Sequence, residues 1–306
     1  MFHIHMTYKN SKYNKTVPSV AVLLSAFNGI RWIESQIKTI LAQKNVSIKI
    51  FISIDISIDK TYELCCLLSK KNKNITLLPY GKRFGGAAKN FYRLIRDVDI
   101  SKFDYIALSD QDDIWDKNKM YQATRIIEKN NLGGYSSDIT AFWANGRKKI
   151  EKKSFPQKKY DYYFESAGPG CTYVLKKQPM IEFKKFLIKN WKKVNSIELH
   201  DWIIYAFFRS QNFKWIIDNK PLMYYRQHRF NQFGLNSGYK AYFYRLKKIK
   251  SKWYFGEVCK ITNLLNIISP NKFSLNRNFL IKNFWNLRRR PRDTIILLFL
   301  NIFYLF

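Results

Sequence analysis

The chain has 306 residues, enough for one large domain or two small ones. Its composition, 46% apolar and 17% aromatic, excludes an intrinsically disordered protein. Lys and Arg number 54 against 22 Asp and Glu, and the formal net charge of +32 predicts an anionic partner: nucleic acid, anionic lipid or a phosphorylated substrate.

Two further features concern the compartment. The longest apolar segment, 294–306, falls short of the roughly 20 residues that a transmembrane helix needs. The four cysteines, Cys65, Cys66, Cys171 and Cys259, show no CxxC spacing, and we recognise no secretory signal. We therefore expect a cytoplasmic protein whose thiols stay reduced and serve in packing.

After a polar N-terminus, expected to be loose over residues 1–18, strands and helices alternate. A continuous apolar run at Val20–Leu24 is typical of a strand that is buried on both faces. The elements expected next are helix 31–43, strand 48–54, a helical segment through Leu64, Leu67 and Leu68, strand 75–78, helix 87–96 and strand 105–108. This order predicts an α/β fold with a mostly parallel, Rossmann-like sheet flanked by helices. In such sheets ligands bind beyond the carboxyl ends of the strands.

The second part of the chain is less regular. Gly133 and Gly134 are expected to break the helical segment that begins at residue 117. Pro179 is expected to take the first position of a helix. The expected elements are helices at 117–129, 179–189 and 202–209, strands at 139–143, 214–217 and 222–225, and a loop at 148–163.

The run Tyr105–Trp115 is the most informative one, because it places Asp110, Asp112 and Asp113 directly after an apolar strand. Three carboxylates so close repel one another unless a divalent cation neutralises them. Mg²⁺ or Mn²⁺ held in this way usually completes its shell with water and substrate phosphates. The alternative is a solvated acidic turn ahead of a helix.

A second acidic pair, Asp55 and Asp59, follows the second expected strand. Two acidic clusters at strand ends predict a nucleotide diphosphate site, in which one cluster takes the base and ribose and the other holds the metal. Neither GxxxxGK[ST] nor GxGxxG follows the first strand, which excludes the simplest P-loop and dinucleotide sites.

These residues resemble a known family. The segments Ser25–Asn28, Asp55–Thr61, Gly85–Phe91 and Ser109–Trp115 fall in the order seen in family 2 glycosyltransferases. The last segment is similar to that of bacterial rhamnosyltransferases of surface-polysaccharide (O-antigen or capsule) assembly. The resemblance covers roughly residues 20–225 and implies a GT-A fold, a nucleotide-diphospho-sugar donor, a divalent metal (Mn²⁺ or Mg²⁺) and inverting transfer.

Carried over position by position, the resemblance implies a role for each matching residue. Asp55 would hydrogen-bond the base. Asp110 and Asp112 would form the DxD pair, with Asp112 as the direct metal ligand, while Asp113 would cap the following helix. Asp201 would be the general base. The remaining implied contacts are Ser25, Phe27, Asn28, Asn90, Asp110 and Arg226 with the nucleotide diphosphate, His228 with the metal, Trp115, Gly170, Cys171 and His200 with the sugars, and Asn231 in the same late motif as His228.

Some of these residues have a structural alternative. Asp201 would otherwise be a helix N-cap ahead of Trp202, and His228 a hydrogen-bonded structural histidine. Asn90 and Arg93 would otherwise lie on a solvated helix face.

One segment departs from the family pattern, which usually reads Asp-Asp-Gly-Ser-x-Asp. Here Ile54 and Ile56 stand in place of the first Asp and the Gly. Ile56 lacks the conformational freedom of glycine, so the turn geometry and the nucleotide affinity are in question. dTDP-rhamnose is the favoured donor, and a UDP-hexose stays open because thymine and uracil present the same edge to Asp55.

We expect a GT-A domain over 19–235, with a nucleotide-binding half (19–116) and an acceptor half (117–235), followed by a basic helical extension (236–306). Between residues 239 and 292 this extension holds fourteen Lys and Arg and a single acid, Glu257. Such a segment suits adsorption to an anionic membrane surface, and equally a C-terminal helix that closes the core. The expected acceptor is a polyprenyl-diphosphate-linked saccharide at the inner face of the cell membrane.

Two other functions stay open. The charge and the interleaved aromatic residues also fit a nucleic-acid-binding protein, although the clustered carboxylates oppose a phosphate backbone. Ile54 and Ile56 also fit a membrane-associated scaffold that has kept the fold and lost catalysis. The sequence does not predict the oligomeric state.

Overall fold

The computed structural model describes residues 17–228, 252–269 and 272–302. Residues 1–16 of the N-terminus that was expected to be loose over residues 1–18 lie outside the described residues, and so does the motif residue Asn231. From residue 17 to 143 the elements are β1 (Ser19–Ala26), α1 (Ile33–Leu41), β2 (Ser47–Ile54), α2 (Thr61–Lys71), β3 (Ile75–Leu77), α3 (Ala87–Asp97), β4 (Tyr105–Ser109), β5 (Ile114–Trp115), α4 (Lys119–Lys129), β6 (Gly134–Ser137) and β7 (Ile139–Trp143).

The remaining elements include three helices near the C-terminus. They are β8 (Lys148–Glu151), η1 (Asp161–Tyr163), η2 (Gly170–Thr172), β9 (Val174–Lys176), α5 (Lys177–Lys189), α6 (Trp191–Val194), α7 (His200–Ser210), β10 (Trp215–Asp218), β11 (Met223–Gln227), α9 (Trp253–Leu265), α10 (Arg277–Lys282), η3 (Phe284–Asn286) and α11 (Pro291–Ile302).

A seven-stranded sheet in the order β10-β6-β9-β4-β1-β2-β3 forms the centre of the molecule. β1 pairs in parallel with both β2 and β4, and Val20 lies opposite Ile48 and Tyr105. Of these seven strands β9 alone runs antiparallel, between β4 and β6. The sheet is thus mostly parallel, as the alternation of elements predicts, and the carboxyl ends of β1, β2 and β4 meet at one edge.

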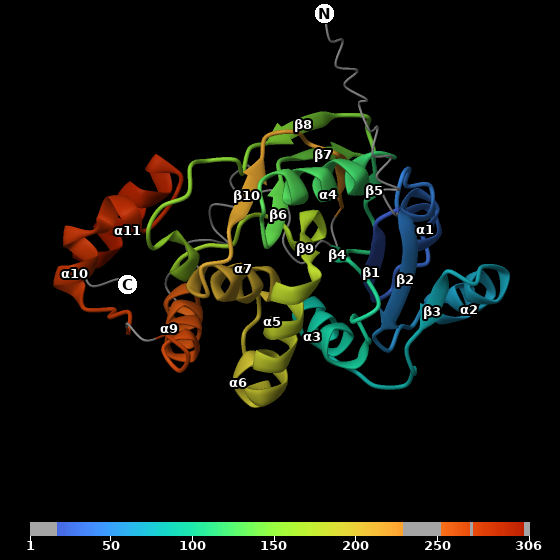
Figure 1. The fold of residues 1–306 in the computed structure, drawn as a ribbon, viewed down its shortest axis with the longest axis horizontal. Coiled ribbons are helices and arrows are strands. Elements are labelled where there is room, and N and C mark those ends of the chain that lie inside the picture. Colours follow the sequence, from blue (N-terminus) through green and yellow to red (C-terminus); the bar gives the residue numbers. More distant parts are fainter. Residues whose placement is uncertain (1–16, 229–251, 270–271, 303–306) are drawn as a thin grey trace, which may run out of the picture.

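Helices cover both faces of this sheet (Figure 1). Val20, Val22 and Leu24 of β1 pack in one hydrophobic cluster with α1 and α4. Leu23 points to the other face and packs in a cluster with α3, α5 and α7. Successive side chains alternate across a strand, so burial on both faces explains the unbroken apolar run of β1.

A smaller sheet, in the order β5-β11-β7-β8, stands beside the first. Its strand β8 corrects the loop expected at 148–163, because Lys148 pairs with Phe142 of β7. Gly134 is the first residue of β6 and does not only interrupt the chain. Glycine is needed there because a Cβ would lie 2.2 Å from Cε3 of the Trp215 ring. Pro179 is the third residue of α5, not the first.

The C-terminal helices α9, α10 and α11 lie at the end of the molecule away from α2 and β3 (Figure 1). Val258, Ile261 and Leu265 of α9 belong to the same hydrophobic cluster as α3, α5 and α7. The buried carboxylate of Glu257 accepts a hydrogen bond from the backbone N–H of Glu198 (2.9 Å), just ahead of α7. The basic extension therefore shares its core with the preceding residues. No helix among the described residues combines the length and hydropathy that crossing a bilayer requires.

Candidate active site

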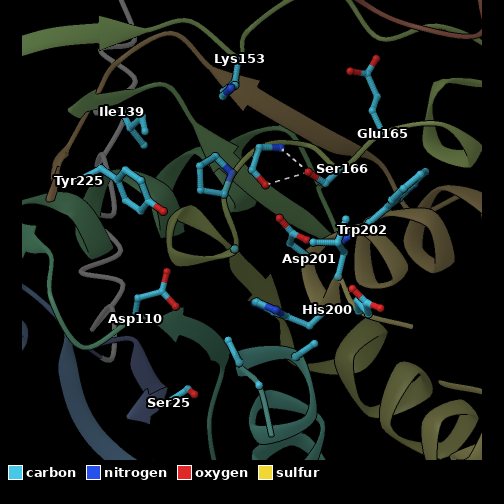
Figure 2. A pocket seen from close by; sticks show the side chains of 18 of the residues that line it. Ser25, Asp110, Ile139, Lys153, Glu165, Ser166, His200, Asp201, Trp202 and Tyr225 are labelled. Carbon is cyan, nitrogen blue, oxygen red and sulfur yellow. Dashed lines mark hydrogen bonds between the residues drawn. The ribbon is translucent and has the colours of Figure 1, made fainter. Parts of the chain in front are cut away.

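A cavity of about 1670 Å³ opens beyond the carboxyl ends of β1, β2 and β4. Its walls come from three parts of the chain that are far apart in sequence. Ser25 and Asp110 stand at the sheet edge, and Asp201 lies across from them (Figure 2). Arg290 belongs to a third wall, made by the C-terminal segment.

The loop after β1 is tied to the carboxylate run by Gln111. Its side-chain amide accepts a hydrogen bond from the Phe27 N–H and donates one to the Phe27 carbonyl, each at 2.8 Å. A Cβ at Gly29 would stand 2.2 Å from the Gln111 Oε1, so only glycine fits there without moving the amide. Asn28 takes a positive φ of 47° and accepts a hydrogen bond from the N–H of Ile58 (2.9 Å). The sequence interpretation missed Gln111, although an amide between two Asp residues was its visible signal.

Asp55 lines the cavity from the end of β2. Its Oδ1 accepts from the N–H groups of Phe84 (2.8 Å) and Ile56 (2.9 Å), and its Oδ2 accepts from Gly85 (2.9 Å). A carboxylate has about four acceptor positions, so one on Oδ2 is left to face a ligand. The replacement of the family's glycine by Ile56 does not prevent the turn after Asp55 from forming. Ile56 is not among the residues with positive φ, so the conformational freedom of glycine is not needed there.

Asn90 and Arg93 do not lie on a solvated helix face, because they are only 1% and 5% exposed. The Asn90 amide donates to the Ser53 carbonyl (3.0 Å) and to the Ala26 carbonyl (3.4 Å). Arg93 donates to the Ser53 hydroxyl (2.8 Å). Both side chains therefore hold the ends of β1 and β2 in place, and Asn90 reaches the cavity wall while its amide is engaged in this way.

Asp110 and Asp112 both line the cavity, and so does His228. The Nε2 of His228 lies 2.7 Å from a carboxylate oxygen of Asp112, and its ring stacks on Trp32 at 4.1 Å. Burial and the neighbouring charge of Asp112 raise the pKa of Asp110 to about 7. Two carboxylates and an imidazole that face one space are a donor set that suits Mn²⁺ or Mg²⁺, whose charge would relieve this repulsion.

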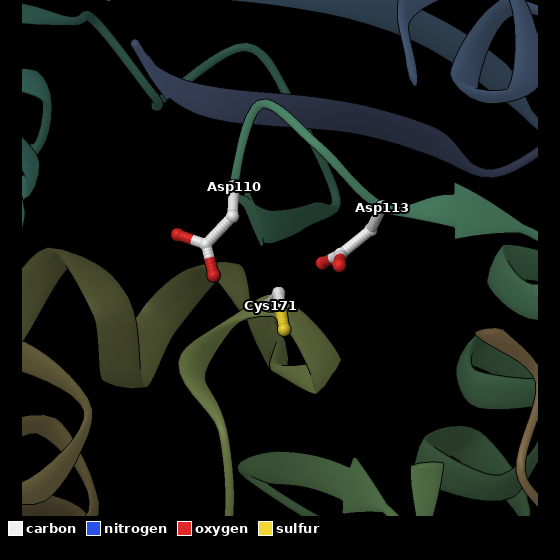
Figure 3. Close-up of side chains that lie close together, drawn as sticks. All are labelled: Asp110, Asp113 and Cys171. Carbon is white, nitrogen blue, oxygen red and sulfur yellow. The ribbon is translucent and has the colours of Figure 1, made fainter. Parts of the chain in front are cut away.

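Asp113 does not line the cavity. Its carboxylate lies close to the Cys171 thiol, which is below both Asp110 and Asp113 in Figure 3. Burial and the charges of the two carboxyls raise the pKa of Cys171 well above its usual value, so the sulfur stays a thiol. A buried thiol is a poor ligand for a hard cation, so Asp110, Asp112 and His228, which face the cavity, are the better matched donor set. Asp113 does not cap the next helix, because Asn118 is the N-cap of α4.

Asp201 lies at the start of α7, in the cavity wall. Burial raises the pKa of Asp201 to about 6, against the hydrogen bonds of the Trp202 N–H and the Ser166 hydroxyl. Leu199, not Asp201, is the N-cap of α7, which excludes the capping alternative. A half-buried carboxylate with a pKa near neutrality is the kind of group that accepts a proton from a substrate.

His200 and Gly170 form the floor beside Asp201. The His200 ring stacks on Phe91 at 4.0 Å, and burial lowers its pKa to about 3, so the imidazole is neutral at pH 7. Its Nε2 has no hydrogen-bond partner among the described residues. A Cβ at Gly170 would lie 2.5 Å from this nitrogen, so only glycine fits there without moving the His200 ring.

The sequence interpretation also missed a link between the C-terminus and Asp201. Arg289 is buried, forms an ion pair with the buried Asp161 (3.1 Å) and donates to the backbone carbonyl of Ser166 (2.5 Å). The Ser166 hydroxyl in turn contacts Asp201. The run of arginines from Arg288 was its visible signal, but the sequence suggested a membrane for it and not a wall of the cavity.

Comparison with known proteins agrees with this geometry. A family profile described as "Glycosyl transferase family 2" matches residues 21–189. The chain belongs to glycosyltransferase family 2. It is 47% identical over 289 residues to the "dTDP-rhamnosyl transferase RfbG" of Shigella flexneri, which covers 92% of this chain and 100% of that protein. The resemblance seen in the sequence is thereby confirmed.

Solved structures of glycosyltransferases have the same fold. S. aureus TarS 1-349 in complex with UDP superposes with a TM-score of 0.54 at 13% identity, covering 87% of this chain and 72% of that one. The mannosyltransferase PcManGT of Pyrobaculum calidifontis, in complex with GDP-Man and Mn²⁺, gives 0.53 at 12% identity, over 80% and 65% of the two chains. The expected GT-A fold is confirmed.

Three roles that the family resemblance implied are not supported by where the side chains lie. Trp115 is 3% exposed, packs in the core under the Lys119 ammonium (3.6 Å) and does not line the cavity. Cys171 lies below the carboxylate loop and is fully buried. Arg226 donates through Nε to the Asp112 carbonyl (2.8 Å), and its guanidinium lies over Phe142, outside the cavity wall.

Two of these corrections, those for Trp115 and Arg226, have a common cause. Trp115 and Arg226 belong to β5 and β11, which pair with each other, and their side chains point away from the cavity. On β11, Tyr225 and the following His228 are the residues that reach the cavity. In this glycosyltransferase Arg226 therefore supports the carboxylate loop, and His228 is the described residue of the late motif that lines the cavity.

Proposed function

We propose that this glycosyltransferase transfers a rhamnosyl group from dTDP-rhamnose to a lipid-linked saccharide, with inversion at the anomeric carbon. The observation that carries the proposal is one cavity lined by Asp110, Asp112 and His228 at the sheet edge and by Asp201 across from Asp110 (Figure 2). The relative from Shigella flexneri, at 47% identity over nearly the whole chain, supports the choice of donor.

The donor nucleotide would lie along the sheet edge. The open acceptor position on Asp55 Oδ2 suits the ring N–H of thymine, and the exposed ring of Phe27 offers a surface for stacking. Uracil presents the same N–H, so a UDP-hexose is the alternative donor.

A divalent cation, Mn²⁺ or Mg²⁺, would be held by Asp110, Asp112 and His228. When bound, it supplies charge neutralisation for the departing diphosphate. Asp112 is oriented for this task by His228 on its carboxylate and by Arg226 on its backbone carbonyl.

Asp201 would remove the proton from the acceptor hydroxyl as the hydroxyl oxygen attacks the anomeric carbon. The bond between that carbon and the diphosphate oxygen breaks, and the nucleoside diphosphate leaves with the electron pair. The attack comes from the face opposite the leaving group, so the base and the cation belong on opposite sides of the reacting sugar, which fits the separation of Asp201 from Asp110 in the cavity (Figure 2).

The enzyme would work at the inner face of the cell membrane. Ile295, Phe299 and Ile302 are 46%, 55% and 40% exposed on the outer side of α11, directly after the basic run. An exposed apolar face beside arginines suits peripheral binding to an anionic bilayer.

The test is transfer from a panel of nucleotide sugars to a prenyl-diphosphate saccharide, with and without Mn²⁺ or Mg²⁺. We expect turnover with dTDP-rhamnose and metal, and its loss with EDTA. Turnover with a UDP-hexose but not with dTDP-rhamnose would mean that the donor is a UDP-hexose. Failure to bind any nucleoside diphosphate by calorimetry would contradict the proposal and favour the non-catalytic scaffold.

A further inference from the structure

The C-terminal wall of the cavity carries more positive charge than its own carboxylates neutralise. Arg288 and Arg289 are paired with Glu165 (3.7 and 3.5 Å), and Arg292 is paired with Asp293 (3.1 Å). Lys149, Lys152 and Arg290 line the same wall, and no carboxylate of the described chain lies within ion-pair distance of them. These three side chains therefore carry the positive charge that the neighbouring carboxylates leave unneutralised.

Two of these cations flank one aromatic ring. The ammonium of Lys152 lies 5.1 Å from the centre of the Phe155 ring, and the guanidinium of Arg290 lies 6.0 Å from it. All three residues belong to the cavity wall. Both cations approach the same ring at the cavity wall, and an anion in the cavity that contacts both would offset their mutual repulsion and gain charge-assisted hydrogen bonds.

The segment that carries Arg290 is held firmly. Arg289 donates to the carbonyl of Ser166, and its backbone N–H donates to Glu165 (2.5 Å). The Arg290 carbonyl accepts from the N–H groups of Asp293 (2.9 Å) and Thr294 (3.0 Å), which fixes it to the first turn of α11. A preorganised cation loses less freedom on binding an anion than one on a free chain.

Apolar side chains continue the same wall beyond the cations. Ile296, Leu297 and Leu300 of α11 line the cavity, and Ile296 is 46% exposed. The buried side of α11 includes the polar Thr294 and Asn301, whereas its outer side holds Ile295 and Phe299. Because Leu297 is buried as well, α11 carries apolar side chains on both its buried and its outer side, unlike an ordinary surface helix.

We propose that Arg290 and Lys152 bind the diphosphate of a polyprenyl-diphosphate acceptor, whose isoprenoid chain lies along Ile296 and Leu300 of α11. The inference rests on the proposed function for the saccharide end of that acceptor. A diphosphate matches the two unpaired cations, and an isoprenoid chain matches the apolar wall that follows them. The wall would thus hold the lipid end of the acceptor while the sugar end reaches Asp201.

The experiment measures binding of farnesyl diphosphate to the full-length protein by calorimetry, with dTDP and Mg²⁺ present to fill the donor site. The double variant Arg290→Ala/Lys152→Ala is expected to raise the Kd by about tenfold or more, because two charge-assisted contacts are lost. The Arg290→Lys variant keeps the charge and is expected to retain most of the affinity.

The matched control is Arg125→Ala/Lys129→Ala on α4, which removes the same charge from an exposed helix outside the cavity wall. Arg125 also lies beside an aromatic ring, that of Tyr121 (5.7 Å). Circular dichroism establishes that each variant folds. An unchanged Kd in the Arg290/Lys152 variant, or an equal loss in both double variants, would overturn the inference.

Two further arms separate the sources of binding. Sedimentation with phosphatidylcholine vesicles containing phosphatidylglycerol is expected to be equal for the two double variants, and a loss confined to the Arg290/Lys152 variant would assign these cations to lipid headgroups and overturn the inference. In transfer assays, an unchanged acceptor KM in that variant also overturns it. Cation-dependent binding of farnesyl diphosphate by a protein that transfers no rhamnose supports the inference and removes only the proposed function.

Discussion

The two walls of the cavity are built in different ways. At the sheet edge, Asp55 and Gln111 are held by backbone groups of nearby loops, such as Gly85 and Phe27. The opposite wall depends on buried side chains from distant parts of the chain, such as Arg289 with Asp161. The sheet edge, where we propose that the donor binds, thus depends on loops that follow successive strands, and the opposite wall depends on ion pairs between buried side chains.

The difference teaches where each kind of damage should appear. A change at the sheet edge should alter nucleotide binding while the fold persists. A change in the opposite wall should alter stability or the chemical step while the nucleotide still binds. The predictions that follow test this separation.

The largest effect is expected for Asp201→Asn. Removing a general base lowers kcat by about 10²- to 10⁴-fold. Because Asp201 belongs to α7 and not to the sheet edge that carries Asp55 and Asp112, the Kd of dTDP should not change. Steady-state kinetics and calorimetry measure the two quantities, and Asp99→Asn, on an exposed turn, is the control. A parallel loss of dTDP binding would break the separation of the walls.

Arg289→Met should lower the free energy of unfolding by about 3 kcal/mol, because it leaves the buried Asp161 with fewer partners. Chemical denaturation measures this effect. Arg292→Met, whose 54% exposed side chain pairs with Asp293, should change stability by less than about 1 kcal/mol. Equal losses of unfolding free energy in the two variants would show that the ion pair of Arg289 with Asp161 behaves as a surface contact and not as part of the core.

The pH profile should report on Asp201. Its pKa is raised to about 6, so the carboxyl is protonated and inactive as a base below that pH. With saturating Mn²⁺, which favours the ionised form of Asp110, kcat at pH 5 should be about one tenth of its value at pH 7. The residual activity of Asp201→Asn should lack this limb, and its persistence would assign the limb to another group.

The smallest effect is expected for Gly29→Ala. The new Cβ would displace the Gln111 amide and weaken its two hydrogen bonds to Phe27, which should raise the Kd of dTDP about fivefold. Gly256→Ala meets no atom within 4 Å inside α9 and should stabilise the protein by up to about 1 kcal/mol without changing dTDP binding. An unchanged Kd of dTDP in Gly29→Ala would mean that the hydrogen bonds between Gln111 and Phe27 do not shape the proposed nucleotide site.

The sequence predicts the donor side well because its signals are local. An apolar run followed by Asp55 or Asp110 indicates a strand and its end in one stretch of residues. β9 was missed because its three residues owe their strand to pairing with β4 and β6 and not to any pattern of their own. The directions of Trp115 and Arg226 depend on pairing between β5 and β11, more than 100 residues apart in sequence, which no local pattern records.

The C-terminal wall was the hardest part to predict. Its arginines form a visible run, but nothing in the sequence places Arg289 beside Asp161 or Glu257 beside Glu198. A high local charge suggests a solvated or membrane-facing surface, and the buried carboxylates that neutralise part of it come from far away in the chain. α11 has a buried side with Leu297 and an exposed apolar side with Ile295 and Phe299, so its packing on the core leaves the expected membrane contact as a prediction for the exposed side.

Glu257, the single acid between residues 239 and 292, has a consequence for the order in which the enzyme becomes functional. It reaches back to the N–H of Glu198, two residues ahead of the helix that carries Asp201. On the ribosome, the sheet edge can form while this carboxylate is still unsynthesised, but the start of α7 cannot receive its contact. A nascent chain should therefore bind nucleotide before it can transfer a sugar, which delays catalysis until nearly the whole polypeptide has emerged.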